Sequence, residues 1–271
     1  MTIFLIALLI LFVLLKRPIS KFDNLKEVPK KSVAIITLMY RPKNVETWLL
    51  IHRNLGIDHF FIRLEDTPEL IDYLKSQPDV TLMVASSSKD TNQYTTLQTR
   101  QIETTNKVIK SCKFDFLIHI DCDEILDGDL DEIRNLPDNV GTFWMQNHEA
   151  VYSSIPTSRD SCFQAKFYRN CGDVGSGCAS YVNGKGGGRI CQSLESNGPH
   201  RFKSNLREKK INMIVKHYES CDFEQYLKKY SRLQQGAKID EIPFPYYRES
   251  ILAAGNMDNL KNIYAKYRTD N

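Results

Sequence analysis

Two aspartates separated by one residue stand where an apolar run ends. Residues 114–120 form the run, Asp121 and Asp123 follow it, and Glu124 comes next. In extended backbone, residues two apart point to the same side, so both carboxylates can face one ligand. Mn²⁺ and Mg²⁺ are bound by carboxylates together with phosphates, and such an ion neutralises the charge that develops on a departing diphosphate. The motif therefore predicts that Asp121 and Asp123 hold Mn²⁺ or Mg²⁺ against a sugar nucleotide.

The same motif has other interpretations. Asp127 and Asp129 follow it, and an acidic cluster suits the N-terminus of a helix. A strand followed by Asp-x-Asp also occurs in phosphatases with an aspartyl nucleophile, which would make Asp121 the nucleophile. In those enzymes the motif usually lies on the first strand and continues toward Gly-Thr, whereas here it follows the fourth apolar segment and continues Glu-Ile-Leu. A phosphohydrolase is therefore the alternative enzyme.

A glycine-rich segment offers cations for a phosphate. Lys185 and Arg189 flank three consecutive glycines, which allow backbone and cations to approach a donor diphosphate closely. A flexible basic loop is an equally good interpretation of this pattern. Residues 172–188 as a whole predict a lid that becomes ordered over bound donor.

Transfer with inversion needs a carboxylate that takes the proton of the acceptor hydroxyl. Glu149 follows the strand-like run 141–145 and is the candidate base, with Asp173 as a second candidate. An exposed loop acid is the competing interpretation of Glu149.

The elements that must position these residues alternate between strands and helices. Strands are expected at 32–39, 59–64, 80–84 and 114–120, and helices at 45–55, 68–74 and 91–112. This alternation predicts an α/β fold with a mostly parallel sheet and helices on both faces. Ligands of such sheets bind at the carboxyl ends of the strands, where Asp121 lies. Residues 153–205 are expected to be irregular, and helices are expected at 222–236 and 247–268.

The N-terminus differs from the rest of the chain. Residues 3–15 are uninterruptedly apolar, and residues 16–31 are basic and contain proline. We expect a single-pass membrane anchor at 1–15, a stalk at 16–31 and one catalytic domain at 32–271. A cleaved signal peptide is the alternative, although no small-x-small site follows the run. The charges after the run favour a cytosolic domain, whereas a Golgi-type enzyme would need the opposite bias, so the side of the membrane stays open.

Composition narrows the class of protein. The 271 residues are 42% hydrophobic and 25% charged, as in ordinary globular proteins, and the net charge of +3 gives no reason to expect nucleic acid as a partner. Of the seven cysteines, four lie at Cys162, Cys171, Cys178 and Cys191, without a Cys-x-x-Cys pair. They predict one or two disulfides if the domain faces an oxidising compartment.

Several segments together resemble a known family. The chain is similar to the glycosyltransferases of family 92 and their family-2-like relatives, which share the GT-A fold. The segments that carry the resemblance are 46–60, 114–126, 198–202, 217–218 and 226–230. In order and spacing they cover residues 33 to about 235, and each of them is short.

The resemblance implies a metal-dependent enzyme that moves a hexose from a UDP-sugar, with UDP-galactose as the family-level expectation, to a glycan or glycoconjugate acceptor. Asp121 would contact the donor ribose or the metal, and Asp123 would bind the metal directly. His200 would be a further metal or diphosphate contact, since a neutral imidazole is a good Mn²⁺ ligand, and His217 is a secondary candidate for the same role.

The donor base would lie over the ends of the first two strands, which makes Thr37, Arg41 and Asp66 candidates for donor binding. Asp66 is also interpreted as a helix N-cap, a position that Thr67 could take instead. The family usually carries an Asn-Glu pair shortly after the first strand, and this pair is not intact in residues 40–46. A degenerate relative that binds glycans or nucleotides without catalysis is therefore a further alternative.

Overall fold

The structure is a computed structural model that describes residues 30–270, apart from 43, 88–92, 158–159, 173–177, 237, 243 and the side chains of 93–96, 160–161 and 241. The chain divides into two compact units, 1–30 and 31–271, and the described residues belong to the second unit except for Lys30. The predicted anchor at 1–15 and nearly all of the predicted stalk lie outside the described residues. Within the described part of the chain, no helix has the length and apolar character needed to cross a membrane.

The first half of the domain is the predicted α/β alternation. Its strands are β1 (Val33–Tyr40), β2 (His59–Glu65), β3 (Val80–Ala85) and β4 (Phe116–His119). Its helices are α2 (Val45–Leu55), the short 3₁₀ turn η1 (Pro68–Leu70) with α3 (Ile71–Lys75), and α4 (Gln93–Ser111). The strands pair in parallel in the order β3-β2-β1-β4. The expected strands and helices are thus confirmed in this half.

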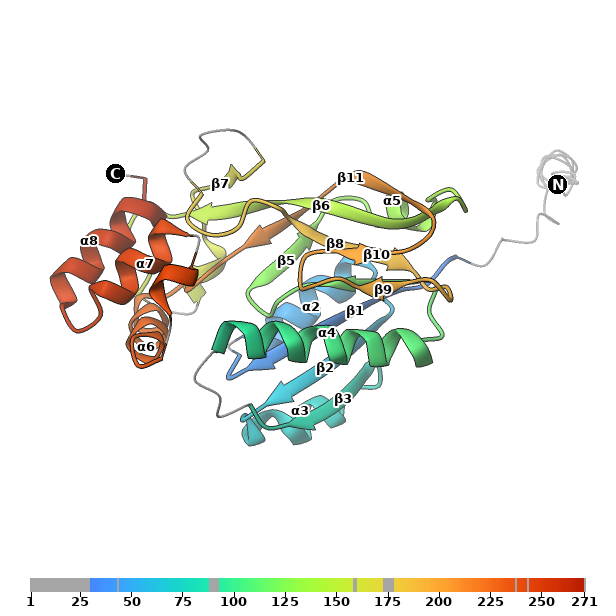
Figure 1. Cartoon of the computed structure of the whole chain (residues 1–271), viewed down its shortest axis with the longest axis horizontal. Helices are drawn as coiled ribbons and strands as arrows, with labels where there is room; N and C mark the ends of the chain where they lie inside the picture. Colours follow the sequence, from blue (N-terminus) through green and yellow to red (C-terminus); the bar gives the residue numbers. More distant parts are fainter. Residues whose placement is uncertain are drawn as a thin grey trace, which may run out of the picture. The chain divides into compact units, whose positions relative to one another are not determined.

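Helices cover both faces of this half, as predicted (Figure 1). Successive residues of β1 point to opposite faces. Ile35 belongs to the apolar core that also contains Trp48 of α2 and Leu74 of α3. Its neighbour Ile36 belongs to a second core with Val108 of α4.

The second half departs from the prediction of a mostly parallel sheet. The nine-stranded sheet continues from β4 in the order β8-β6-β11-β5, with β7 beside β6. These strands are β5 (Glu124–Asp127), β6 (Val140–Val151), β7 (Phe167–Asn170), β8 (Lys185–Arg189) and β11 (Arg207–His217). Only β6 and β11 pair in parallel here, and the other four pairings are antiparallel. Parallel neighbours are usually joined by long helical crossovers, whereas the described residues between β5 and β11 form only the short helical elements α5 (Asp131–Arg134) and η2 (Asp160–Phe163).

The glycine-rich segment contains a central strand, so the expectation of a flexible loop at 185–189 was wrong. β8 lies between β4 and β6 and is antiparallel to both. Its glycines make room for neighbouring atoms: a Cβ on Gly187 would lie 2.7 Å from the carbonyl oxygen of Leu117, and one on Gly188 would lie 2.3 Å from Cδ1 of Leu194. Close packing, and not mobility, explains these glycines. Residues 173–177 of the predicted lid lie outside the described residues.

Three helices follow β11 and form a compact group at one end of the sheet (Figure 1). They are α6 (Phe223–Leu233), α7 (Pro245–Leu252) and α8 (Met257–Arg268), close to the expected ranges. Buried tyrosines dominate their shared core: Tyr226, Tyr230, Tyr246 and Tyr264. The remaining short elements are α5 (Asp131–Arg134), η2 (Asp160–Phe163), η3 (Ile239–Glu241), β9 (Glu195–Ser196) and β10 (Phe202–Lys203).

Two disulfides join cysteines of the second half. Cys171 pairs with Cys178, as the sequence allowed within the cysteine-rich segment. Cys162 pairs with Cys221, which lies outside that segment at the junction of β11 and α6. Cys191, Cys122 and Cys112 are free thiols.

Candidate active site

The carboxyl ends of several strands meet at one edge of the sheet. β1, β4, β6 and β11 run in the same direction, because β8 is antiparallel to both β4 and β6. The loop with Asp121 and Asp123 follows β4 at this edge. His217 ends β11, where it lies opposite Glu124 of β5 and Glu149 of β6. The fold thus brings four acidic side chains and a histidine to one edge.

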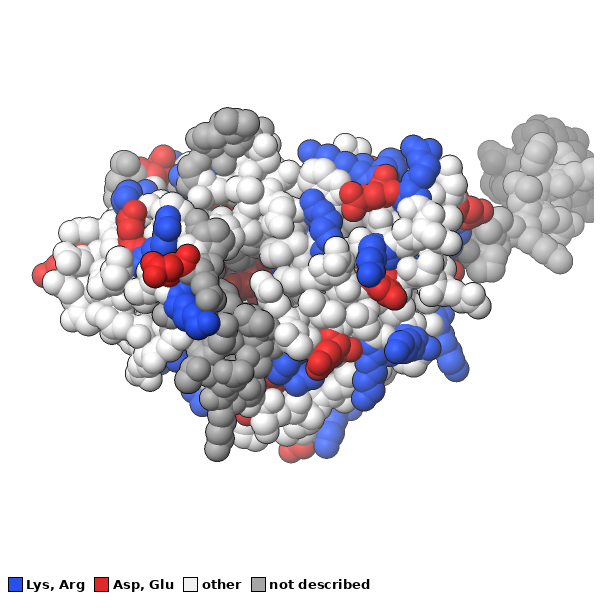
Figure 2. All heavy atoms as spheres, viewed as in Figure 1, with Lys and Arg blue, Asp and Glu red and all other residues white. Residues whose placement is uncertain are grey.

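A cavity of about 980 Å³ opens at this edge. Asp121 and Asp123 line it, together with residues from the end of β1, from α4 and from α6 and α7 on the opposite side. Figure 2 shows acidic atoms at the floor of a hollow beside the C-terminal helices. Among the described residues that line the cavity, these two aspartates are the only carboxylates. The volume is typical of a site for a ligand of nucleotide size.

Asp121 is engaged by its neighbours through both carboxylate oxygens. Gln101 of α4 donates to Oδ1 at 2.8 Å, and the Lys185 ammonium donates to Oδ2. Burial acts to raise the pKa of Asp121, but Lys185 outweighs it and holds the pKa well below its usual range. Asp121 is therefore an ionised carboxylate in a fixed orientation.

Asp123 is more open to the cavity. Its side chain is 39% exposed, and its Oδ2 lies 3.7 Å from Nε2 of His217. Desolvation acts to raise the pKa of Asp123, but the protonated ring of His217 outweighs it, so the pKa is lowered. Burial in turn acts to lower the pKa of His217, but Asp123 and the neighbouring carboxylates outweigh it and raise that pKa. Of the two aspartates, Asp123 is the more exposed, so its carboxylate is the one more available to a ligand.

Lys185 lies beneath the two aspartates, where it has no exposed surface. Its ammonium contacts Asp121 and lies 3.3 Å from Oε2 of Glu124. Burial acts to lower the pKa of Lys185, but the two carboxylates raise it to about 12. Glu124 is itself buried, which raises its pKa, and it accepts hydrogen bonds from the Tyr181 hydroxyl and from the amide of Asp121 at 2.7 Å.

Two histidines flank the ring of Tyr181. The ring centroid of His200 lies 4.5 Å and that of His217 5.1 Å from the Tyr181 centroid. His200 Nδ1 lies 2.9 Å from the carbonyl oxygen of Gly184, so Nδ1 carries the hydrogen and Nε2 keeps its lone pair. Burial lowers the pKa of His200 to about 3. His200 lines the cavity as a neutral imidazole, the form that binds metals.

The predicted donor-binding residues separate into two groups. Arg41 lines the cavity, with its guanidinium 5.3 Å from the ring centroid of Tyr40. Thr37 is buried in β1 and does not reach the cavity. Asp66 lies at the end of β2 but does not line the cavity, and it accepts hydrogen bonds from the amide and hydroxyl of Ser87. It does not cap a helix, since the residue before η1 is Thr67.

Lys185 and Arg189 are not placed to bind a donor. Lys185 is enclosed beneath Asp121, as described above. Arg189 lies opposite Phe116, at the start of β4, about 13 Å along the strand from Lys185. Its guanidinium donates to the carbonyl oxygens of Val140, Leu136 and Pro137. Both predicted contacts with the donor are therefore corrected.

Glu149 is also placed differently from the prediction. Its side chain is 1% exposed, and it does not line the cavity. A base must reach the acceptor hydroxyl directly or through one water, which this carboxylate does not do. The second candidate, Asp173, lies outside the described residues.

The predicted metal ligands do not form a preassembled cage. Among the described residues, two groups of three have ligand atoms within 4.8 Å of one another: Glu149 with Cys171 and Cys178, and Asp222 with Cys162 and Cys221. The cysteines of both groups are disulfide-bonded. Asp121, Asp123 and His200 share one cavity without meeting this criterion.

No family model matches the chain, and no curated protein sequence matches it. Three solved structures show a distant likeness. A mannosyltransferase from Pyrobaculum calidifontis, solved with GDP-Man and Mn²⁺, is 12% identical and matches over 97% of this chain and 81% of its own, with a TM-score of 0.39. TarS from S. aureus is 11% identical over 86% and 43% of the two chains, with a TM-score of 0.34, and HddC from Yersinia pseudotuberculosis is 9% identical over 69% and 77%, with a TM-score of 0.31. At these scores the likeness supports no statement about activity, and the resemblance to family 92 stays a prediction.

Several site residues were missed by the sequence reasoning. Gln101 is one polar residue on a long helix, and only the packing of α4 on the sheet brings it to Asp121. Ser180 and Tyr181 lie in a segment without periodicity. His217, by contrast, belongs to a segment of the family resemblance and was a further candidate for the contact expected of His200.

Proposed function

We propose that this protein is a metal-dependent glycosyltransferase with a GT-A-like fold. It transfers a hexose from a UDP-sugar, with UDP-galactose as the first candidate, to a hydroxyl of a glycan or glycoconjugate. The observation that carries the proposal is the pair Asp121 and Asp123 on the floor of a cavity, at the carboxyl edge of the sheet. Asp121 is held by Gln101 and Lys185, while Asp123 remains partly exposed.

The residues present fit Mn²⁺ or Mg²⁺ as a cofactor. Such ions are commonly held by one or two carboxylates and complete their coordination with substrate phosphates and water, so a full protein cage is not required. Asp123 would hold the ion, with Nε2 of His217 or of His200 as the nitrogen donor. When bound, the ion supplies positive charge where the diphosphate leaving group becomes more negative.

Other residues of the cavity would bind and orient the nucleotide and the acceptor. Arg41 lies at the end of β1 and offers a guanidinium to the nucleotide. Lys229 and Tyr247, 3.0 Å apart from Nζ to hydroxyl, line the opposite wall on α6 and α7. We assign this part of the cavity to the acceptor, because it offers aromatic and basic side chains that can contact a sugar.

An inverting course requires a base that Glu149 does not supply. Inversion stays part of the proposal as the expectation from the family resemblance, and Asp173 is then the candidate base. Attachment through residues 1–15 as a single-pass anchor likewise remains part of the proposal.

A phosphohydrolase is less well supported by the geometry. Its nucleophile would be Asp121, but both carboxylate oxygens of Asp121 already accept hydrogen bonds from protein donors. Attack on phosphorus by either oxygen would compete with the hydrogen bond that this oxygen already accepts.

The test is release of nucleoside diphosphate by the purified full chain from a panel of UDP- and GDP-sugars, with and without Mn²⁺. Metal-dependent release from one donor, lost in Asp123→Asn, is the expected result. Release of phosphate from simple phosphate esters, without any turnover of sugar nucleotides, would contradict the proposal and favour the hydrolase. Metal-dependent binding of a nucleotide without turnover would instead indicate a binding module.

A further inference from the structure

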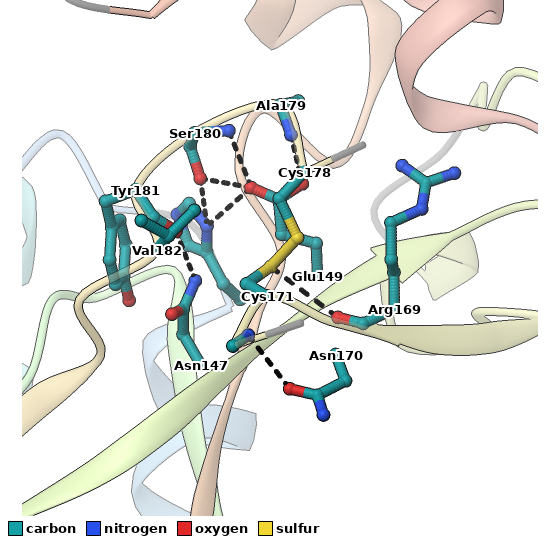
Figure 3. The surroundings of a disulfide bond; sticks show 12 residues. Asn147, Glu149, Arg169, Asn170, Cys171, Cys178, Ala179, Ser180, Tyr181 and Val182 are labelled. Atoms are coloured by element: carbon teal, nitrogen blue, oxygen red, sulfur yellow. Dashed lines mark hydrogen bonds and ion pairs between the residues drawn. A yellow bond between two sulfur atoms is a disulfide. The ribbon is translucent and has the colours of Figure 1, made fainter. Parts of the chain in front are cut away.

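Glu149 has an unusually complete set of partners for a residue outside the cavity. Its two oxygens accept hydrogen bonds from the amides of Ala179 at 2.6 Å and Ser180 at 2.7 Å, and from the Ser180 hydroxyl. Nη1 of Arg268, which is fully buried, lies 3.6 Å away. Figure 3 shows the carboxylate of Glu149 directed at the backbone turn that carries Ala179 and Ser180. The carboxylate of Glu149 therefore fixes the position of the backbone at Ala179 and Ser180.

The Ser180 hydroxyl links Glu149 to His217 at the candidate active site. It lies 3.1 Å from Nδ1 of His217. A hydroxyl has one hydrogen, which here is donated to Glu149, so it meets His217 with an oxygen lone pair. Nδ1 of His217 must therefore donate, and the other ring nitrogen, Nε2, is the one that lies 3.7 Å from Asp123.

We propose that Glu149 is a positioning residue that acts through Ser180 to fix the tautomer and ring orientation of His217. The consequence is that Nε2 of His217 stays beside the carboxylate of Asp123. This inference rests on the proposed function only in taking Asp123 as the carboxylate that binds the metal. It replaces the role of a base, which the burial of Glu149 excludes.

The surrounding structure holds the chain of contacts rigidly. Glu149 and His217 are paired across β6 and β11, and both are buried. The disulfide at Cys178 fixes the residue immediately before Ala179 (Figure 3). Asn147 of β6 donates to the carbonyl oxygen of Tyr181 at 2.6 Å and so secures the other side of the same turn.

A flipped His217 ring would lose the acceptor that Ser180 provides and would turn a carbon toward Asp123. Hydrogen-bond partners that orient a metal-binding histidine typically contribute a factor of about 10 to 100 in metal affinity. The same factor is expected here when Ser180 loses its hydroxyl.

The tautomer is read directly from the ¹⁵N chemical shifts of His217 in the metal-free full chain, at a pH where the ring is neutral. The wild type is expected to show hydrogen on Nδ1 alone. Ser180→Ala is expected to populate both tautomers and to bind Mn²⁺ about 10- to 100-fold more weakly. Ser180→Thr, which keeps the hydroxyl, should restore the Nδ1–H form.

Ser250→Ala is the matched control, because Ser250 is a buried serine of α7 whose hydroxyl donates to the Tyr246 carbonyl at 2.6 Å. It should change neither the tautomer nor Mn²⁺ affinity. Glu149→Gln separates the two roles: loss of Mn²⁺ affinity supports positioning, whereas loss of turnover at unchanged Mn²⁺ affinity would overturn it in favour of a base.

Hydrogen on Nε2 of wild-type His217 would overturn the inference without any variant, so a Ser180→Ala protein that fails to fold does not remove the test. An unchanged Nδ1–H form in Ser180→Ala would also overturn it. If the wild type binds no Mn²⁺, the proposed function fails, while the tautomer measurement still decides this inference.

Discussion

Replacing Lys185 by methionine removes the buried cation beneath the aspartates and keeps a side chain of similar length. Lys185 Nζ lies 3.3 Å from Oε2 of Glu124 and also contacts Asp121. At an effective dielectric constant of about 20, one such pair at this separation interacts by roughly 5 kcal/mol, and the loss of Lys185 desolvation offsets part of it. Removing one member of a buried ion pair costs about 3–5 kcal/mol. We therefore expect Lys185→Met to lower the free energy of unfolding by about that amount at pH 8.

The loss should depend on pH. Burial raises the pKa of Glu124, and Lys185 opposes that rise. Without Lys185 the folded-state pKa of Glu124 rises further above its unfolded value. A carboxyl group with a raised folded pKa stabilises the fold at low pH and loses that contribution as the pH increases, so the deficit of Lys185→Met should be smaller at pH 5 than at pH 8.

Urea denaturation of both proteins at the two pH values, with disulfides intact, measures this difference. Lys228→Met is the control, because Lys228 and its partner Glu224 are both 69% exposed and the change should stay within about 0.5 kcal/mol. A loss below about 1 kcal/mol at pH 8, or one that does not shrink at pH 5, would refute the assignment of Lys185 as the counter-ion of these carboxylates.

Three further predictions concern the frame of the site. Burial lowers the pKa of His52 from 6.5 to about 4, so the folded protein favours the neutral ring. As the pH falls from 6.5 toward 4, the free energy of unfolding should therefore decrease by roughly 3 kcal/mol on account of His52. Unfolding titrations of His52→Gln should show a smaller dependence of stability on pH. Replacing Cys171 and Cys178 together by serine should lower the free energy of unfolding by about 2–3 kcal/mol, since that disulfide closes a short loop. The same change should weaken Mn²⁺ binding, and unchanged Mn²⁺ affinity would show that the disulfide does not hold Ser180 in place. Gly187→Ala should cost about 1–3 kcal/mol in denaturant titrations, because its Cβ would lie 2.5 Å from Cζ of Phe143, and a neutral result would contradict the close packing of β8.

The first half of the fold was predictable because its pattern is regular. Apolar runs alternate with helical spacing up to residue 120, and β1 to β4 with α2 to α4 follow that pattern closely. The position of Asp121 and Asp123 after a strand was predictable for the same reason. The strand-like run at 141–145 lies within β6, but the stretch from there to residue 217 was not predictable, because β8 is built largely of glycines whose side chains carry no periodic signal.

The parts of the site that were mispredicted depend on register and on partners distant in sequence. Whether Lys185 and Arg189 meet a donor depends on the antiparallel register of β8, which puts one at each end of β4. Glu149 was taken for a loop acid or a base because its amide partners at 179 and 180 lie 30 residues away in a segment without a pattern. His217 reaches Asp123 only because β11 inserts between β5 and β6.

The central claim is that a nucleoside diphosphate binds in this cavity through a metal held by Asp123. Calorimetric titration of UDP into the full chain, with and without Mn²⁺, tests it most directly, with Asp127→Asn as the matched control, since Asp127 is a half-exposed aspartate of β5 paired with Lys216. We predict that Mn²⁺ strengthens UDP binding at least about tenfold, that Asp123→Asn abolishes this effect and that Asp127→Asn retains it. Equal UDP affinity with and without Mn²⁺, or an Asp123→Asn protein that keeps the full effect of Mn²⁺, would contradict the account.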